Sequence, residues 1–479
     1  MSTRPPRPMP RLPAVVLVVL LTAGVAVAEQ GSSRSRPSFR TLESAIDGPT
    51  IPRDDAVSVA WFCSEGSSAA TGRAAETVLI ANLATRPIDA RVTVLRGADQ
   101  SPTVERRQIP ALAQERIPVS DLVEADDPGV VVEVLGGPAV VEHELRAGND
   151  VAVNPCARAA ARDWYFAGGT TVLGAQEWLT LVNPFGEDAI VNVTFLTTSG
   201  KESPGATESL AVPRRSRVSV PVHESVLREE QLAIAVHARL GRVVAERSLI
   251  FDGTDTRLGF ATSLGVRDSA RRWRFPVADG QAGAAQTLSI ANFADSSATV
   301  EVRVRPDGAD ALDAQTVDVA GQSVERVSLI ESVPVGVGYT IDVRVTRGAP
   351  IVAETLGTWA APAVVTGVAS GHGSVTEARR WAFAIGRPDE TTEAVISAIN
   401  VSARPLTVQL YAYTAGDPNS PASAPARAVR PGERAEFRLS EIGTRPDQVI
   451  VISADGPIVV GRLILGAGIS ISAGIPELS

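Results

Sequence analysis

Three glutamates recur at matching places along the chain and are the most regular candidates for acid-base chemistry. Glu142, Glu246 and Glu354 each follow a pair of apolar residues. A carboxyl group held in a pocket can act as a general acid or base. A group that returns at one position in several copies, however, is better explained as part of the fold than as three active sites. A fourth stretch carries Arg462 at the corresponding count.

A recurring arginine is the natural partner to consider for these glutamates. Arg217 and Glu246 are one possible pair. In the fourth stretch the same pairing would bring Arg434 against Arg462, unless the two positions are not neighbours or a nearby glutamate compensates. The sequence therefore leaves the pairing open.

No catalytic motif accompanies these residues. The chain has no G-x-S-x-G nucleophile elbow, and its single lysine, Lys201, does not lie in a phosphate-binding loop. A zinc site needs clustered ligands. The four histidines are scattered at His143, His223, His237 and His372. We therefore predict no catalytic residue, no metal site and no cofactor.

The chain has two cysteines, Cys63 and Cys156, and neither lies in a C-x-x-C pair. An even number of cysteines in a chain outside the cytoplasm favours a disulfide. We therefore predict a Cys63–Cys156 bridge that ties the beginning of one repeat to its end.

Trp178 is the one candidate for ligand binding. It lies five residues before Asn183, where the alternation of apolar and polar residues predicts an outward side chain. An outward tryptophan can stack on a sugar or anchor a protein contact, and packing against a neighbouring domain is just as ordinary.

Four copies of one pattern explain these regularities. A tryptophan opens each copy, at intervals of 103, 109 and 108 residues, and an asparagine then ends a short apolar run. An arginine lies 34 residues after each asparagine. The tryptophans are Trp61, Trp164, Trp273 and Trp381, the asparagines Asn82, Asn183, Asn292 and Asn400, and the arginines Arg116, Arg217, Arg326 and Arg434.

Apolar and polar residues alternate on both sides of each asparagine. Val78 and Ile80 precede Asn82, and Val92 and Val94 follow it. Such alternation is typical of half-buried antiparallel strands. Each copy has about 105 residues, the size of an immunoglobulin-like sandwich. We therefore predict an all-β chain of four tandem immunoglobulin-like β-sandwich repeats, joined by short connections into a semi-rigid rod or arc.

The N-terminal segment predicts where the chain is sent. Arg4, Arg7 and Arg11 precede an uncharged apolar run at 12–28, which is the pattern of a signal peptide. The run is near the lower limit for a membrane span, so a cleaved signal and a retained anchor both stay open. The positive-inside rule places the rest of the chain, beyond this run, outside the cytoplasm. The predicted parts are a signal or anchor helix at 1–28, a flexible linker at 29–57, and repeats at 58–161, 162–270, 271–378 and 379–479.

Composition excludes some classes of protein. The formal net charge is −9, which argues against nucleic-acid binding because phosphate recognition needs a basic surface. With 44% hydrophobic and 21% charged residues, the chain is not wholly disordered.

The repeats resemble those of actinobacterial envelope proteins that are grouped only as a domain of unknown function. The similar motifs are Trp164-Tyr165-Phe166, the segment 179–184 and Val243-Val244-Ala245-Glu246. The resemblance covers most of the chain after the linker. It implies an extracytoplasmic location, brings no catalytic residue, and weakly suggests a glycan-related role.

The sequence thus favours a non-enzymatic extracytoplasmic envelope protein, acting as a scaffold or as a binding module for a protein or a cell-surface glycan. The alternative is a carbohydrate- or peptidoglycan-modifying enzyme with a site between domains, which needs a cleft with two carboxylates about 5 to 10 Å apart. The expected partners are an envelope protein or a cell-wall glycan, with no nucleic acid, and the membrane if the N-terminal helix is retained.

Overall fold

The computed structural model describes residues 48–329, 333–415, 417–466 and 468–478. The predicted signal or anchor helix at 1–28 and most of the predicted linker lie outside these residues. Nearly every element within them is an antiparallel strand, which confirms the all-β fold class. In this part of the chain, no helix is long and apolar enough to cross a membrane.

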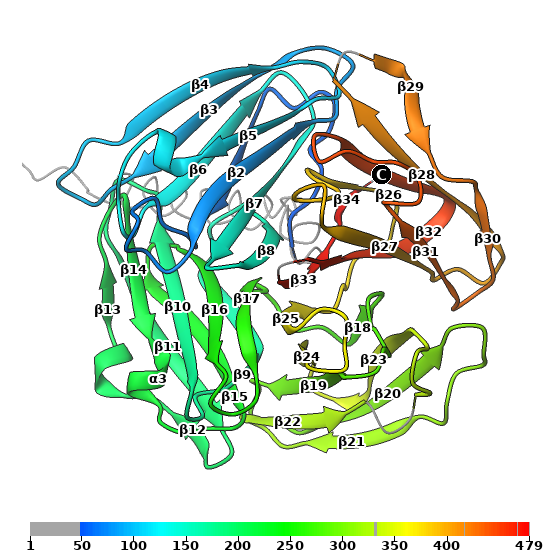
Figure 1. Ribbon diagram of the computed structural model, residues 1–479. Coiled ribbons are helices and arrows are strands. Elements are labelled where there is room, and N and C mark those ends of the chain that lie inside the picture. Colours follow the sequence, from blue (N-terminus) through cyan, green and yellow to red (C-terminus); the bar gives the residue numbers. More distant parts are fainter. Residues whose placement is uncertain (1–47, 330–332, 416, 467, 479) are drawn as a thin grey trace, which may run out of the picture. The chain divides into compact units, whose positions relative to one another are not determined.

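The strands fall into four sets in chain order, which we call modules 1 to 4 (Figure 1). Module 1 contains β1 (Ser58–Cys63), β2 (Ala75–Asn82), β3 (Ile88–Leu95), β4 (Thr103–Ile109), β5 (Gln114–Pro118), the 3-10 helix η1 (Val119–Asp121), β6 (Gly129–Leu135), β7 (Ala139–Ala147) and β8 (Asp150–Pro155). Module 2 contains β9 (Asp163–Gly169), β10 (Ala175–Asn183), β11 (Ala189–Thr197), β12 (Gly200–Glu202), the 3-10 helix η2 (Gly205–Thr207), β13 (Leu210–Val212), β14 (Ser216–Pro221), α3 (Val222–Ser225), β15 (Leu232–Leu240), β16 (Val244–Asp252) and β17 (Leu258–Leu264).

The last two modules repeat the same order of strands. Module 3 contains β18 (Arg272–Phe275), β19 (Ala284–Asn292), β20 (Ala298–Pro306), β21 (Gln315–Val319), β22 (Ser323–Ser328), β23 (Tyr339–Gly348), β24 (Val352–Trp359) and β25 (Gly367–His372). Module 4 contains β26 (Ala378–Phe383), β27 (Glu393–Asn400), β28 (Leu406–Thr414), β29 (Asp417–Ser423), β30 (Arg427–Val429), β31 (Arg434–Arg438), β32 (Val449–Leu465), β33 (Ile469–Ala473) and β34 (Ile475–Glu477).

Two sheets make up each of modules 1 to 3. We call the sheet with the repeated tryptophan the Trp sheet and the sheet with the repeated asparagine the Asn sheet. In module 1 the Trp sheet has the order β1-β6-β3-β4 and the Asn sheet the order β5-β2-β7-β8. Module 4 differs because its long strand β32 runs through both sheets, pairing first with β26 and β28 and then with β27 and β33.

The repeated tryptophans fill the module cores, as their recurrence predicts. Each of them is at most 2% exposed, which leaves the polar ring N–H in need of a partner. Trp164 and Trp273 donate their Nε1 hydrogens to the backbone carbonyls of Val243 and Ile351 at 2.7 and 2.8 Å. In modules 2 and 3 the tryptophan therefore fixes its own strand against the segment that leads into the Asn sheet of the same module.

The repeated asparagines close the turn that leads from the Asn sheet to the Trp sheet. Asn82 donates through Nδ2 to the carbonyls of Arg86 and Pro110 at 2.8 Å, and its Oδ1 accepts from the N–H of Ala84 at 2.8 Å. The corresponding residues Asn183, Asn292 and Asn400 make the same kinds of contact. A buried side chain that must donate and accept at once explains why an amide recurs here.

Contacts between the modules return from the fourth to the first. Strand β8 contacts β17 and β33, and β25 contacts the same two strands. The amide of Ile51 also donates to the carbonyl of Pro476 at 2.8 Å. The open rod or arc expected from the short connections is therefore wrong for the described residues, because an open chain of modules has no such closing contacts.

Candidate functional site

The repeated glutamates lie where one module meets another, on β7, β16 and β24, and their side chains are buried. Each uses Oε2 to accept hydrogen bonds from two successive backbone amides of another module. These amides lie at the end of the strand that carries the repeated tryptophan, or directly after it. Glu142 accepts from Ala384 and Ile385 at 2.9 and 3.2 Å, Glu246 from Ser64 and Glu65 at 2.8 and 2.5 Å, and Glu354 from Ala167 and Gly168 at 3.1 and 2.9 Å. The glutamates thus satisfy buried amides across the junctions.

A basic residue from the module that provides the amides completes each of these sites. Its position directly follows the glutamate position of its own module. The ion pairs are His143 Nε2 with Glu246 Oε1 at 3.2 Å, Arg247 Nη2 with Glu354 Oε1 at 2.5 Å, and Arg462 Nη2 with Glu142 Oε1 at 2.8 Å. Buried acid-base pairs therefore hold module 1 to 2, module 2 to 3, and module 4 to 1.

The strand register corrects the placement of Arg462 at the glutamate position. Glu246 lies opposite Thr180, three residues before the repeated asparagine, and the residue opposite the equivalent Ser397 is Gly461. Arg462 instead has the place of the repeated base. The spacing along the sequence placed Arg462 at the glutamate position, one residue after the true equivalent, Gly461. The reason is that the loops of the fourth copy differ in length from those of the other copies.

The junction between modules 3 and 4 lacks the acid, the base and one amide donor together. Gly461 occupies the position of the repeated glutamate, and Thr355 occupies the position of the basic residue. Pro276, which has no N–H, replaces the first amide donor. A Cβ on Gly461 would lie 2.8 Å from Cγ of Pro276 and 2.9 Å from Cγ2 of Val277, so only glycine fits there without displacement.

The repeated arginines do not pair with the repeated glutamates of their own modules. Arg217 reaches into module 1, where its Nη2 lies 3.1 Å from Oε1 of Glu65. Arg434 lies 2.8 Å from Glu436 in module 4. Since Arg462 points to module 1, the clash of like charges considered from the sequence does not arise.

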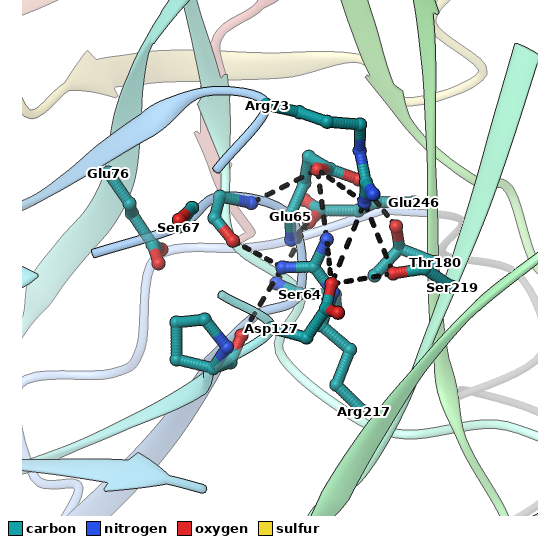
Figure 2. A network of polar contacts seen from close by, with 12 residues as sticks. Ser64, Glu65, Ser67, Arg73, Glu76, Asp127, Thr180, Arg217, Ser219 and Glu246 are labelled. Carbon is teal, nitrogen blue, oxygen red and sulfur yellow. Dashed lines mark hydrogen bonds and ion pairs between the residues drawn. The ribbon is translucent and has the colours of Figure 1, made fainter. Parts of the chain in front are cut away.

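Figure 2 shows the junction of modules 1 and 2, where Glu65 lies among polar groups of both modules. Oε1 of Glu65 lies 3.1 Å from Arg217 and 3.6 Å from Arg73, and the hydroxyl of Thr180 donates to Oε2. The side chains of Glu65 and Arg217 are each 1% exposed. Water therefore screens their attraction very little.

The protonation states at this junction follow from burial and neighbouring charge. Burial by itself raises the pKa of Glu65, but nearby guanidinium groups, Arg217 first, outweigh it and hold the pKa below its usual value. Burial also tends to lower the pKa of His143, yet Glu246 and Glu76 raise it to about 10. His143 is therefore a cation near neutral pH, and it is the positively charged partner of Glu246 at this junction.

At the junction of modules 2 and 3, Arg247 lies between two buried carboxylates. Its Nη2 is 2.5 Å from Glu354, and its Nε is 3.8 Å from Glu177. Burial raises the pKa of Glu177 to about 8, which Arg247 offsets only in part. For Glu354, burial acts in the same direction, but Arg247 outweighs it and lowers the pKa. The guanidinium of Arg247 thus stabilises the ionised carboxylate of Glu354, whereas Glu177 is mostly protonated near pH 7.

Trp178 lies at the junction of modules 1 and 2. The guanidinium of Arg73, from module 1, lies 4.2 Å from its ring centroid, and the ring of His223 meets it edge-on with centroids 5.3 Å apart. This geometry corresponds to packing against a neighbouring module. A ligand-binding role for Trp178 stays a prediction.

The disulfide between Cys63 and Cys156 is present. Cys63 holds the place of a phenylalanine, and Cys156 holds the place of a glycine against which that phenylalanine packs. The equivalent pairs are Phe166 with Gly265, Phe275 with Gly373, and Phe383 with Gly474. A Cβ on Gly265 would lie 2.8 Å from the ring of Phe166. The disulfide therefore fills the space that a phenylalanine ring, packed against a glycine, fills in the other modules.

The described residues contain one group of three metal-ligand types whose donor atoms lie within 4.8 Å of one another, Cys63, His143 and Cys156. Both sulfur atoms are bonded to each other in the disulfide. Metal ions bind the thiolate form of cysteine, so this group is not a metal site in its oxidised state.

A central cavity of about 100 Å³ receives residues from all four modules. It is lined by the ends of β8, β17, β25 and β33, with small residues such as Gly371 and Ser472, and also by His372. The lining includes no carboxylate.

Carboxylates do line a cleft of about 360 Å³ between modules 3 and 4, namely Asp279, Asp307 and Glu436. Arg434 binds Asp307 at 2.7 Å and Glu436 at 2.8 Å. Oδ2 of Asp279 accepts a hydrogen bond from Nε1 of Trp359 at 3.3 Å. All three acids of this cleft thus have partners within the fold.

Sequence reasoning identified the repeated acids but missed the residues that bind them. The basic residues follow the glutamate position directly, and this adjacency was the available signal. The amide donors carry no signal of their own, because any residue except proline can supply them.

The described residues form four all-β modules, and buried acid-base pairs join the modules at three of their junctions. The model of a family of unknown function, DUF5719, matches residues 140–360, a segment that includes all three repeated glutamates. No curated protein matches the chain.

Two solved structures are similar to parts of the chain. The crystal structure of Thermotoga maritima 1070 is 18% identical, covering 22% of this chain and 95% of that chain, with a TM-score of 0.20. The FN1–FN3 domains of chicken CNTN1 are 10% identical, covering 65% of this chain and 95% of that chain, with a TM-score of 0.10.

Proposed function

We propose that this chain is a non-enzymatic extracytoplasmic envelope protein, which acts as a scaffold or as a binding module for a protein or a cell-surface glycan. The observation that carries the proposal is the use of the repeated ionisable residues. Glu142, Glu246 and Glu354 are buried, and each binds two amides and a base. Groups engaged in this way hold modules together and are not free to meet a substrate.

The proposed location rests on two features of the chain. The arginine-rich start and the apolar run at 12–28 have the pattern of a signal or anchor. The Cys63–Cys156 disulfide fits an oxidising compartment, because thiols in the cytoplasm are kept reduced. The resemblance to actinobacterial envelope proteins supports the same location, and whether the segment is cleaved or retained is part of the test.

The test is recovery of the full chain, carrying a C-terminal tag, from an actinobacterial host. We expect the protein in the envelope fraction, together with a specific protein or glycan after mild cross-linking. Mass spectrometry identifies the protein partner and the mature N-terminus, and sugar analysis identifies the glycan. The tag fused to an unrelated secreted β-sandwich is the control. Recovery in the cytoplasm, or with nothing beyond the control, would contradict the proposal.

The enzymatic alternative is tested at the cleft that holds Asp279. The purified full chain is incubated with peptidoglycan and with wall glycans, and released reducing ends are measured. We expect no release. Release that disappears in Asp279→Asn and persists in the distant variant Asp55→Asn would replace the binding proposal by an enzymatic one.

A further inference from the structure

Module 3 presents five arginines on the outer face of its Trp sheet. They are Arg272 and Arg274 on β18, Arg303 and Arg305 on β20, and Arg344 on β23. Residues two apart in a strand share a face, and the register pairs Arg272 with Arg344. The intervening residues, such as Trp273 and Val302, are buried. The five guanidinium groups therefore lie on the side away from the module core.

The other modules do not carry arginines at most of the equivalent places. Arg303 and Arg305 correspond to Thr93 and Leu95 in module 1, Thr194 and Leu196 in module 2, and Tyr411 and Tyr413 in module 4. Arg272 and Arg274 correspond to Ala60 and Phe62, Asp163 and Tyr165, and Arg380 and Ala382. Since the same fold forms without them, the arginines of module 3 are not required by the fold.

Carboxylates neutralise only part of this charge. The ion pairs are Arg272 with Asp342 at 2.6 Å, Arg303 with Glu301 at 2.7 Å, and Arg274 with Glu377 at 2.5 Å. Arg305 and Arg344 form no ion pair with any of the residues that the structure describes. Five guanidinium groups against three carboxylates leave an excess of positive charge on this face, in a chain whose formal net charge is −9.

Four of the five arginines, Arg272, Arg274, Arg303 and Arg305, line a groove of about 360 Å³ where module 3 meets module 4. The opposite wall is formed by residues 399–402 and 431–432 of module 4. Arg305 and Thr340 also line an adjoining cavity of about 170 Å³. Its other charged residues are paired with one another, Arg430 with Glu433 at 2.6 Å and Arg434 with Asp307 at 2.7 Å, so Arg305 is the one arginine of this cavity without an ion pair among the described residues. The two cavities therefore adjoin at Arg305 and Thr340 along the junction.

This groove occurs at the one junction without the buried acid-base pair. Pro276 and Gly461 pack there in place of the amide donor and the glutamate. The modules are linked instead by an apolar cluster that includes Val277 and Leu463, and by Arg434, which binds Asp307 at its edge. The arginine-lined groove thus lies at the junction that lacks the repeated glutamate and its basic partner.

We propose that this groove binds an anionic glycan, a sugar chain that carries carboxylate or phosphate groups. Planar guanidinium groups bind carboxylate and phosphate oxygens in pairs of charge-assisted hydrogen bonds. A protein partner fits less well, because the arginines of protein interfaces are accompanied by large aromatic anchors such as Trp and Tyr, and no aromatic residue lines this groove. The inference rests on the proposed function, since it specifies the ligand of the binding module.

Binding of defined oligosaccharides to the purified full chain tests this inference. The probes are an oligogalacturonate, which carries carboxylates, a glycerol phosphate oligomer, which carries phosphates, and a neutral maltooligosaccharide of similar length. Calorimetry at low and at physiological salt measures the affinity. We expect binding of at least one anionic probe, weakening as salt rises, and none of the neutral probe.

Arginine variants locate the binding to the groove. The double variant Arg303→Ala with Arg305→Ala should weaken binding by about tenfold or more, because each guanidinium contributes charge-assisted hydrogen bonds. The matched control is Arg239→Ala, which removes an exposed arginine from the Trp sheet of module 2 and should change the affinity by less than about twofold. Melting temperatures verify that all the proteins fold.

Three results would overturn the inference: no binding of either anionic probe, equal binding of the neutral probe, or the same loss of affinity in Arg239→Ala as in the double variant. The recovery experiment separates this failure from failure of the proposed function. If the double variant still recovers the envelope partner as wild type does, the groove is not the binding site and the binding function stands.

Discussion

Arg247 of module 2 and Glu354 of module 3 form an ion pair at 2.5 Å in which neither side chain is exposed. The same carboxylate accepts hydrogen bonds from the amides of Ala167 and Gly168. One buried glutamate thus joins two modules through charge and through the backbone. Two other junctions repeat this arrangement, whereas the junction of modules 3 and 4 replaces it with close packing around Gly461.

Removal of the base should expose the cost of the buried acid. Arg247→Met is expected to destabilise the protein by about 3 to 5 kcal/mol, because Glu354 is left as an uncompensated buried charge. Chemical denaturation measures the change. Arg53→Met is the control, since the ion pair of Arg53 with Asp55 is largely exposed, and its loss should cost less than about 1 kcal/mol. Equal costs for the two variants would show that the buried pair does not hold the junction.

The disulfide can be exchanged for the packing used in the other modules. Removing the bridge as Cys63→Ala with Cys156→Ala should cost about 2 to 5 kcal/mol. Cys63→Phe with Cys156→Gly loses the same bridge but restores a ring against a glycine, so about 1 to 3 kcal/mol should be recovered. The melting temperatures of the two double variants decide. A phenylalanine-glycine variant no more stable than the alanine variant would contradict the equivalence of the two solutions.

Gly461 should tolerate no side chain. In Gly461→Ala the new Cβ would meet Pro276 at 2.8 Å, so we expect a loss of about 1 to 3 kcal/mol. Gly205→Ala is the control, because nothing lies within 4 Å of its Cβ position, and it should change stability by less than about 0.5 kcal/mol. Adding Pro276→Ala to Gly461→Ala should recover part of the loss. Additive losses in the double variant would contradict a direct contact.

Glu177 should make stability depend on pH. Burial raises its pKa from 4.5 to about 8, so the folded state holds this proton more tightly than the unfolded chain does. The resulting stabilisation is complete below about pH 4.5 and is lost as the pH rises to about 8. Glu177→Gln cannot ionise, so its stability relative to wild type should increase across this window and then stay constant.

Denaturation of both proteins between about pH 4.5 and pH 9 measures that difference. Glu208→Gln, which changes an exposed glutamate, serves as the control and should run parallel to wild type. A constant difference between Glu177→Gln and wild type at all pH values would mean that Glu177 ionises in the folded state as readily as in the unfolded chain.

Much of the local structure could be predicted from the sequence. The period-two alternation around Asn82 predicted strands, and the recurrence of Trp61 and its equivalents predicted buried rings. Two cysteines predicted one disulfide. These features depend on neighbours in the sequence or on composition, and side chains of one strand alternate between faces whatever the rest of the fold does.

The tertiary structure decided which residues meet. That Arg462 binds Glu142, that Arg217 reaches Glu65, and that the modules close on one another are facts of packing between segments up to 320 residues apart. Spacing along the chain cannot encode them, because a one-residue difference in a loop moves Arg462 from one position to the next. The sequence by itself thus determined the repeating strands and their cores, while long-range packing decided the acid-base pairs and the groove beside Arg305.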